Sequence, residues 1–313
     1  MGLAYLLCRA ADTIADGTTL PVSDRHRFLN NYKNLFQRFP FDQQLCAEFC
    51  TNINGIQFTD VTQDQQLLEN LSSCWQEMGR QSLTDQALIG NVVSGVIKGM
   101  EMDLRVFEDD TIPHSLSTSA DFERYIQAIG GEPGRFWSEI SLAHIANLPV
   151  QRREPWVHHG VTFGTGLQMV NILRDFPVDI KRGRCYIPED LLVKHQLMLA
   201  DIIPESAAPI SHLVEDKFRV LYVDIIEVAR LRLMRGLEYL ADIPSGQWGL
   251  RAAVIWPLLI GLETLKRLQE APTILNSQER VKVKRWEIYR LLAETAMMIP
   301  FQKWIERKAR SIN

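Results

Sequence analysis

Two pairs of aspartates, each spaced four residues apart within an apolar segment, are the residues of this sequence best placed to do chemistry. The first pair is Asp12 and Asp16, and the second is Asp175 and Asp179. In a helix, residues four apart lie on one face, so the carboxylates of a pair repel each other and lose hydration if buried. Carboxylate oxygens suit Mg²⁺, which commonly bridges protein carboxylates to substrate phosphates. The two pairs therefore predict a metal site that assists the departure of a phosphate or diphosphate.

Other polar residues near the two pairs fit the same chemistry. Arg9, Arg174 and Arg184 lie close to the aspartates in the sequence, and a guanidinium can bind phosphate oxygens through two hydrogen bonds. A single D-x-x-x-D pair is usually a solvated helix face. Two pairs in apolar runs, each preceded by an arginine, favour a binding site instead. Three more residues share the helical faces of the aspartates and are expected to position ligands: Tyr5, Gln168 and Asn171.

Composition excludes several classes of protein. The 313 residues carry 34 Lys and Arg against 38 Asp and Glu, and 46% of them are hydrophobic. This is the composition of a globular chain, and its mild acidity argues against binding nucleic acid. The five cysteines form no C-x-x-C pair and the histidines have no zinc-site spacing, so we expect a reduced, cytoplasmic protein without a zinc site.

The elements that must position these residues are predicted to be helices. Apolar residues recur every three or four positions within residues 88–104, 218–240, 250–268 and 286–298, as in buried amphipathic helices. Strand patterns are nearly absent. The sequence thus predicts an all-α fold of roughly ten helices, a single-domain bundle over residues 1–313 with a central cavity. The longest apolar run, residues 252–262, is about half the length that a membrane-spanning helix needs.

Several motifs together resemble those of the squalene/phytoene synthase family, the head-to-head prenyl-diphosphate synthases. Y-L-L-C-R-A-A-D-T-I-A-D at residues 5–16 resembles the first aspartate-rich motif. Q-M-V-N-I-L-R-D-F-P-V-D at 168–179, with R-G-R-C-Y-I-P at 182–188, resembles the second. G-M-E-M-D-L at 99–104 and R-Y-I-Q-A-I-G-G-E-P-G at 124–134 also resemble family motifs. The resemblance covers nearly the whole chain and is strongest to bacterial squalene synthases, because of D-T-I-A-D and of L-R-A-A-V-I-W-P at 250–257.

The resemblance implies an isoprenoid-synthase helical bundle and a reaction. Two farnesyl diphosphates would condense via presqualene diphosphate, followed by reduction with NADPH to squalene. The four aspartates would bind Mg²⁺, and the three arginines would bind diphosphate. Tyr125 would handle a proton, and the basic segment with Lys282 and Lys284 would lie by the NADPH phosphates. Trp256 and Trp286 are expected to be packing residues.

Three departures from the family pattern accompany the resemblance. The family has some tens of residues before the first motif, so we expect that this chain lacks an N-terminal diphosphate-binding segment. The Glu that many members carry before the last aspartate is Ala15 in one motif and Val178 in the other, and Pro177 is expected to bend the second helix. The V-A-G after the tyrosine is replaced by Ile129, Gly130 and Gly131.

Two alternatives to a squalene synthase remain open at this point. The first is a phytoene or dehydrosqualene synthase, which performs the same condensation without hydride transfer. The second is a catalytically inactive helical partner protein. For the enzyme, lipid substrates and products lead us to expect peripheral membrane contact through an exposed apolar face.

Overall fold

The structure is a computed structural model that describes residues 1–17, 19–37, 41–108, 112–145, 147–148, 150–203, 210–275 and 280–312. Within these ranges the chain forms α-helices joined by short connections, and its only strands are two-residue segments, β1 (His114–Ser115) and β2 (Arg184–Cys185), which pair in parallel. The predicted all-α fold is therefore confirmed. The contacts divide the chain into two compact units, Met1–Glu108 with Arg135–His144, and Asp109–Gly134 with Ile145–Asn313.

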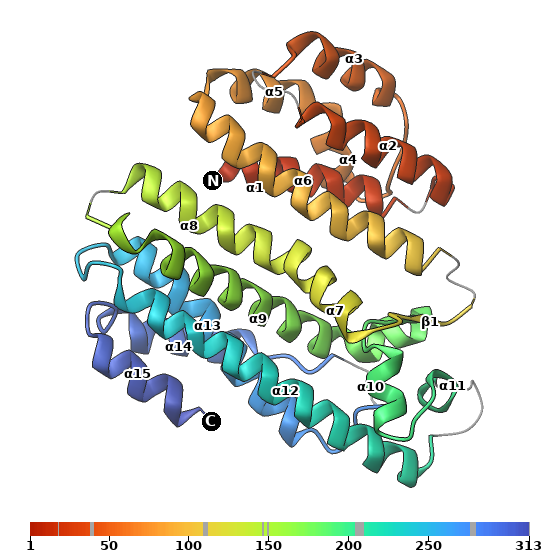
Figure 1. Ribbon diagram of the computed structural model, residues 1–313, viewed down its shortest axis with the longest axis vertical. Coiled ribbons are helices and arrows are strands. Elements are labelled where there is room, and N and C mark those ends of the chain that lie inside the picture. Colours follow the sequence, from red (N-terminus) through yellow and green to blue (C-terminus); the bar gives the residue numbers. More distant parts are fainter. Residues whose placement is uncertain are drawn as a thin grey trace. The chain divides into compact units, whose positions relative to one another are not determined.

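The first unit is built on an aromatic core. Its helices are α1 (Gly2–Ala15), α2 (Val22–Leu35), α3 (Gln43–Ile53), α4 (Thr62–Glu69), α5 (Leu71–Arg80) and α6 (Leu83–Val106), drawn from red to orange in Figure 1. Tyr32 of α2 is fully buried, and its ring centroid lies 5.3 Å from that of Phe49 and 5.9 Å from that of Trp75. The Tyr32 hydroxyl donates to the Leu7 carbonyl of α1 at 3.1 Å, so this core holds the helix of the first aspartate pair.

The second unit is organised around two long helices, α9 (Arg153–Asp179) and α12 (His212–Ala241), which pack along each other (Figure 1). The remaining helices of this unit surround that pair: α7 (Ser119–Ile126), the π-helical η1 (Gln127–Gly131), α10 (Glu189–Lys194), α11 (Leu199–Ile202), α13 (Trp248–Glu270), α14 (Arg285–Ala296) and α15 (Gln302–Ser311). Helix α8 (Glu132–His144) begins in this unit and ends in the first.

Glycines allow the backbones of η1 and α9 to touch. A Cβ at Gly130 would lie 2.4 Å from the Gly164 carbonyl oxygen, and one at Gly164 would lie 2.3 Å from the Gly130 carbonyl oxygen. Side chains at these positions would force the helices apart, since such distances are well below contact distance. The two glycines explain why the segment after Tyr125 can pack directly on the helix of the second aspartate pair.

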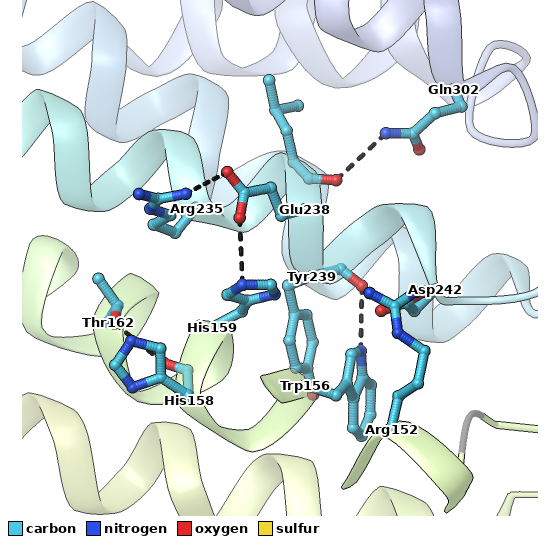
Figure 2. Close-up of polar contacts among 11 residues, drawn as sticks. Arg152, Trp156, His158, His159, Thr162, Arg235, Glu238, Tyr239, Asp242 and Gln302 are labelled. Carbon is cyan, nitrogen blue, oxygen red and sulfur yellow. Dashed lines mark hydrogen bonds and ion pairs between the residues drawn. The ribbon is translucent and has the colours of Figure 1, made fainter. Parts of the chain in front are cut away.

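Side chains from three other helices cap the C-terminal end of α12, where backbone carbonyls lack partners within the helix. Trp156 of α9 donates from Nε1 to the Tyr239 carbonyl at 3.1 Å, and Gln302 of α15 donates to the Leu237 carbonyl at 3.2 Å (Figure 2). Arg251 of α13 donates to the carbonyls of Leu240 and Ile243 at 3.1 and 2.7 Å. These bonds join the C-terminal end of α12 to α9, α13 and α15.

Pro177 lies inside α9, and the helix continues to Asp179 without ending at the proline. A proline has no N–H to donate, which leaves the carbonyl four residues earlier, that of Leu173, without its helical partner. The Tyr222 hydroxyl of α12 donates to this carbonyl at 2.6 Å. The buried tyrosine thereby replaces the hydrogen bond that Pro177 cannot make, in the helical turn that leads into the second aspartate pair.

Replacing Tyr222 with phenylalanine should expose the importance of this bond. The variant would leave the Leu173 carbonyl buried and unsatisfied, so we expect the free energy of unfolding to fall by about 1–3 kcal/mol. Urea denaturation followed by circular dichroism measures the change. Tyr289→Phe is the matched control because Tyr289 is 67% exposed. Equal effects of the two substitutions would contradict the role given to Tyr222.

Helix α13 is longer and more apolar than the run at residues 252–262 suggested. By length and composition alone it could cross a membrane, with a mean hydropathy of 1.3 over its best window, so the expectation that no stretch is long enough is wrong for this helix. However, 61% of that window is buried inside the protein, as in the core helix of a folded domain. The resemblance to a spanning helix is therefore weak.

Candidate active site

The first aspartate pair lies at the C-terminal end of α1. Asp12 is in the last turn, and Asp16 is the C-cap residue, whose N–H donates to the Asp12 carbonyl at 2.8 Å. The helix dipole is negative at this end, and the last turn of α1 contains no basic residue. Burial, and next the charge of Asp16, raise the pKa of Asp12 above its ordinary value. The position therefore favours a cation near these carboxylates.

One arginine supplies part of that positive charge. Arg9 donates from Nε and Nη2 to the two carboxylate oxygens of Asp64 on α4, at 3.1 and 2.6 Å, and it also contacts Asp12. The hydrogen bond to Asp64 is the main reason that the pKa of Arg9 is raised. Arg9 is thus held in a fixed orientation beside the pair, while Tyr5, on the same helix, is 68% exposed.

The second aspartate pair repeats this arrangement at the C-terminal end of α9, whose last turn also contains no basic residue. Arg174 donates to both oxygens of Asp175, at 3.0 and 2.7 Å, and Arg280 Nε lies 3.0 Å from Asp175 Oδ1. Burial, and next the charge of Asp175, raise the pKa of Asp179 to about 6. Both pairs therefore place two carboxylates at a negative helix end with arginines as partial counter-charges.

The turn after α9 brings further positive charge to Asp179. The 3₁₀ turn η3 (Ile180–Arg182) ends at Gly183, whose φ of +75° is a left-handed conformation that suits glycine. The chain then reverses into β2, where His114 N–H donates to the Gly183 carbonyl at 2.8 Å. The charges of Arg280, Arg182 and Arg184 oppose the rise in the pKa of Asp179. Arg184 thus lies near the second pair, as the sequence predicted.

The other predicted residues of the second unit lie in different settings. Asn171 Nδ2 donates to Gln168 Oε1 at 3.4 Å, one turn before Asp175. Tyr125 is buried and stacks on Tyr186, with ring centroids 4.9 Å apart. Lys282 and Lys284, in the basic segment just before α14, are both exposed.

The donor chemistry of the two aspartate pairs suits Mg²⁺. Among the described residues, no group of three or more His, Cys, Asp or Glu side chains is arranged to hold a metal ion. Mg²⁺ does not need such a cage, since it is usually bound by one or two carboxylates with waters and substrate phosphates as the other ligands. Each pair offers two carboxylates, which repel each other and lie at the negative end of a helix dipole. They could therefore supply the protein ligands of Mg²⁺, with waters and phosphates as the others.

The raised pKa of Asp179 predicts a stability effect that depends on pH. A carboxyl with a higher pKa in the folded state than in the unfolded chain destabilises the fold once it ionises, so the cost is absent at low pH and is fully present above its folded pKa of about 6. Without divalent ions, Asp179→Asn should therefore have a higher Tm than wild type at about pH 8 and the same Tm at about pH 4.

Thermal unfolding in a chelator, followed by circular dichroism, makes this comparison. Adding Mg²⁺ at the higher pH should raise the Tm of wild type more than that of Asp179→Asn. Asp216→Asn serves as the control, since Asp216 is exposed on α12. A Tm difference between wild type and Asp179→Asn that is independent of pH would contradict the electrostatic explanation.

Two ion-pair partners of the predicted site residues, Asp64 and Arg280, were not predicted from the sequence. Asp64 is 55 positions from Arg9, and no motif marks it. Arg280 lies two residues before Lys282, at the edge of the basic segment, so its type and place gave a usable signal. Both hold charged residues of the predicted set through ion pairs between distant parts of the sequence.

Comparisons with known proteins agree with the resemblance of the motifs. The family model for squalene/phytoene synthase matches residues 1–287. A phytoene synthase of Thermus thermophilus is 34% identical over 195 residues, covering 62% of this chain and 60% of that protein. A squalene synthase of Yarrowia lipolytica is 22% identical over 298 residues, covering 94% of this chain and 60% of that protein. The chain spans about one third to three fifths of the length of such curated relatives.

Solved structures show the fold. A structure of TcSQS with a bound ligand superposes with a TM-score of 0.74 at 19% identity, covering 99% of this chain and 82% of that one. A dehydrosqualene synthase in complex with a ligand gives a TM-score of 0.56 at 16% identity, covering 95% and 85%. The predicted isoprenoid-synthase type of all-α fold is confirmed by these likenesses.

Proposed function

Since this chain belongs to the squalene/phytoene synthase family, whose members are prenyltransferase-type enzymes that act on prenyl diphosphates, we propose that it condenses two farnesyl diphosphates head to head via presqualene diphosphate. We further propose that NADPH reduces this intermediate to squalene. The observation that carries the proposal is the repeated arrangement of Asp12 with Asp16 and Asp175 with Asp179, each at a helix C-terminus beside arginines.

The charged residues of the chain have separate roles in this proposal. The four aspartates would each offer carboxylate oxygens to Mg²⁺, which when bound would neutralise the diphosphate and make it a better leaving group. Arg9, Arg174 and Arg184 would bind the remaining phosphate oxygens, since they already lie next to the aspartates. Tyr5, Gln168 and Asn171 would position ligands, because they lie on the same helices.

Further roles are proposed for residues outside the aspartate pairs. Tyr125 would handle a proton, and its burial against Tyr186 would keep its ring fixed. Lys282 and Lys284 would bind the NADPH phosphates, which is supported by their exposure and their charge. We propose that residues 1–313 act as one catalytic domain in the cytoplasm, with peripheral membrane contact where the lipid substrates and products dissolve.

The phytoene or dehydrosqualene reaction is the second candidate function. It is favoured by the phytoene synthase of Thermus thermophilus, which is more similar over its matched region than the squalene synthase of Yarrowia lipolytica. The condensation is the same in both candidates, so the aspartates and arginines keep their roles. The candidates differ only in the reduction step. The second candidate uses no NADPH, so it would not need Lys282 and Lys284.

Product analysis tests the two candidates directly. The purified protein is incubated with Mg²⁺ and either farnesyl diphosphate or a longer prenyl diphosphate, with and without NADPH, and the hydrocarbons are identified by mass spectrometry. Squalene that appears only with NADPH would support the first candidate. Phytoene or dehydrosqualene formed regardless of NADPH would support the second. No consumption of farnesyl or longer prenyl diphosphates would instead favour an inactive helical partner protein and refute both.

A further inference from the structure

The C-terminal segment of the chain carries a net charge opposite in sign to that of the whole chain. Residues 280–312 contain nine Lys and Arg against three Asp and Glu, a net charge of +6, whereas the whole chain has a net charge of −4. The rest of the chain is accordingly strongly acidic. Such asymmetry marks a local surface for an anionic partner, because opposite charges attract within about a Debye length of each other.

The exposed face of α14 combines this charge with large apolar side chains. Trp286, Tyr289 and Met297 are 56%, 67% and 79% exposed. Trp286 and Tyr289 are three residues apart, and Met297, the C-cap residue, comes eight residues after Tyr289, so all three lie on one side of the helix. Phe301, just beyond the helix, is 57% exposed, and the Arg290 guanidinium lies 5.2 Å from the centre of the Trp286 ring. Trp286 is thus on the surface, and the expectation that it packs in the interior is wrong.

The opposite side of α14 packs against the protein, which leaves the aromatic side exposed. Thr295 is fully buried and accepts a hydrogen bond from Trp256 Nε1 of α13 at 3.1 Å, so Trp256 has the packing role that was expected of it. The acidic residues of the helix already have basic partners within the protein. Arg267 donates to Glu287 at 2.7 Å, and Lys308 donates to Glu294 at 3.0 Å.

The composition of the exposed side matches one kind of surface. Tryptophan and tyrosine are enriched at the level of lipid headgroups, where the apolar ring and the polar edge are both satisfied. Clustered lysine and arginine beside such residues bind anionic lipids. Helix α14 offers Arg285 and Arg290, both exposed, next to the exposed aromatic residues.

We propose that the lipid-binding face, defined as Arg285, Trp286, Tyr289, Arg290, Met297 and Phe301, docks on the headgroup region of an anionic membrane. This proposal rests on charge and exposure and does not need the proposed reaction. It adds a reason for the reaction's location, because the same segment begins at Arg280, which pairs with Asp175. Docking would bring the segment that pairs with Asp175 to the membrane surface.

Vesicle binding by the whole chain, without substrate, tests the proposal. The protein is sedimented with vesicles of phosphatidylcholine alone or of equal parts phosphatidylcholine and phosphatidylglycerol. We expect binding to the anionic vesicles only, weakened by salt. The double variant Trp286→Ser, Tyr289→Ser should weaken it about tenfold, and Arg285→Glu should also weaken it.

The matched control is Leu213→Ser, Leu231→Ser, two leucines of α12 that are each 68% exposed. It should leave vesicle binding unchanged. Far-UV circular dichroism and Tm values close to wild type show that the variants are folded. Equal binding to neutral vesicles, equal loss in the control, or a face that instead mediates self-association abolished by Trp286→Ser, Tyr289→Ser would each overturn the proposal. Because no substrate is present, the outcome stands apart from that of the product analysis.

Discussion

Asp175→Asn is expected to lower the rate at which farnesyl diphosphate is consumed by about 10²-fold or more. Asp175 is proposed to offer carboxylate oxygens to Mg²⁺, and it also accepts hydrogen bonds from Arg174 and pairs with Arg280, at 2.7–3.0 Å. An asparagine keeps the size of the side chain but removes its charge, so both the cation and the two arginines lose their anchor. Release of inorganic diphosphate, measured over a range of Mg²⁺ concentrations, reports the effect.

The matched control for this substitution is Asp216→Asn on the exposed side of α12. It should retain the wild-type rate, which separates loss of a particular carboxylate from a general change in charge. If Asp175→Asn turns over substrate like the control at every Mg²⁺ concentration, the second aspartate pair has no part in the reaction.

Arg251→Met is expected to produce the largest loss of stability, with a fall of about 3 kcal/mol or more in the free energy of unfolding. Arg251 is only 2% exposed and donates to three carbonyls and to the Gln302 amide oxygen, at 2.7–3.1 Å. Methionine fills a similar volume but leaves these acceptors buried without partners. Since the contacts join α12, α13 and the segment before α15, their loss should loosen that side of the second unit.

Urea denaturation compares Arg251→Met with Arg310→Met, a substitution at an exposed arginine of α15. The control should change the free energy of unfolding by less than about 0.5 kcal/mol. Indistinguishable midpoints and slopes for the two variants would show that the buried hydrogen bonds of Arg251 are not needed for stability.

Local periodicity explains how much of the fold could be predicted from the sequence. The apolar stripes at residues 88–104 and 218–240 lie within α6 and α12, because a one-sided apolar helix has few ways to be buried. The aspartate pairs were also placed correctly on one helical turn each. That both pairs lie at helix C-termini was not predicted, since apolar patterns specify helix ends poorly.

Contacts between distant residues explain most of what was missed. Asp64 and Arg280 reach Arg9 and Asp175 only after the helices have packed, and a single sequence contains no record of such pairing. Pro177 was expected to bend α9, and that bend stays a prediction; the carbonyl that the proline leaves without a helical partner accepts instead from the Tyr222 hydroxyl, 49 residues away. Helix capping by Arg251 has the same long-range origin.

Calorimetric titration with an unreactive analogue of farnesyl diphosphate, in which sulfur replaces the leaving oxygen, tests the central claim that both aspartate pairs hold a magnesium diphosphate. We expect binding to wild type only in the presence of Mg²⁺. A single Asp12→Asn or Asp175→Asn substitution should weaken this binding at least about tenfold. Equal affinity with and without Mg²⁺, or wild-type affinity in either variant, would contradict the account.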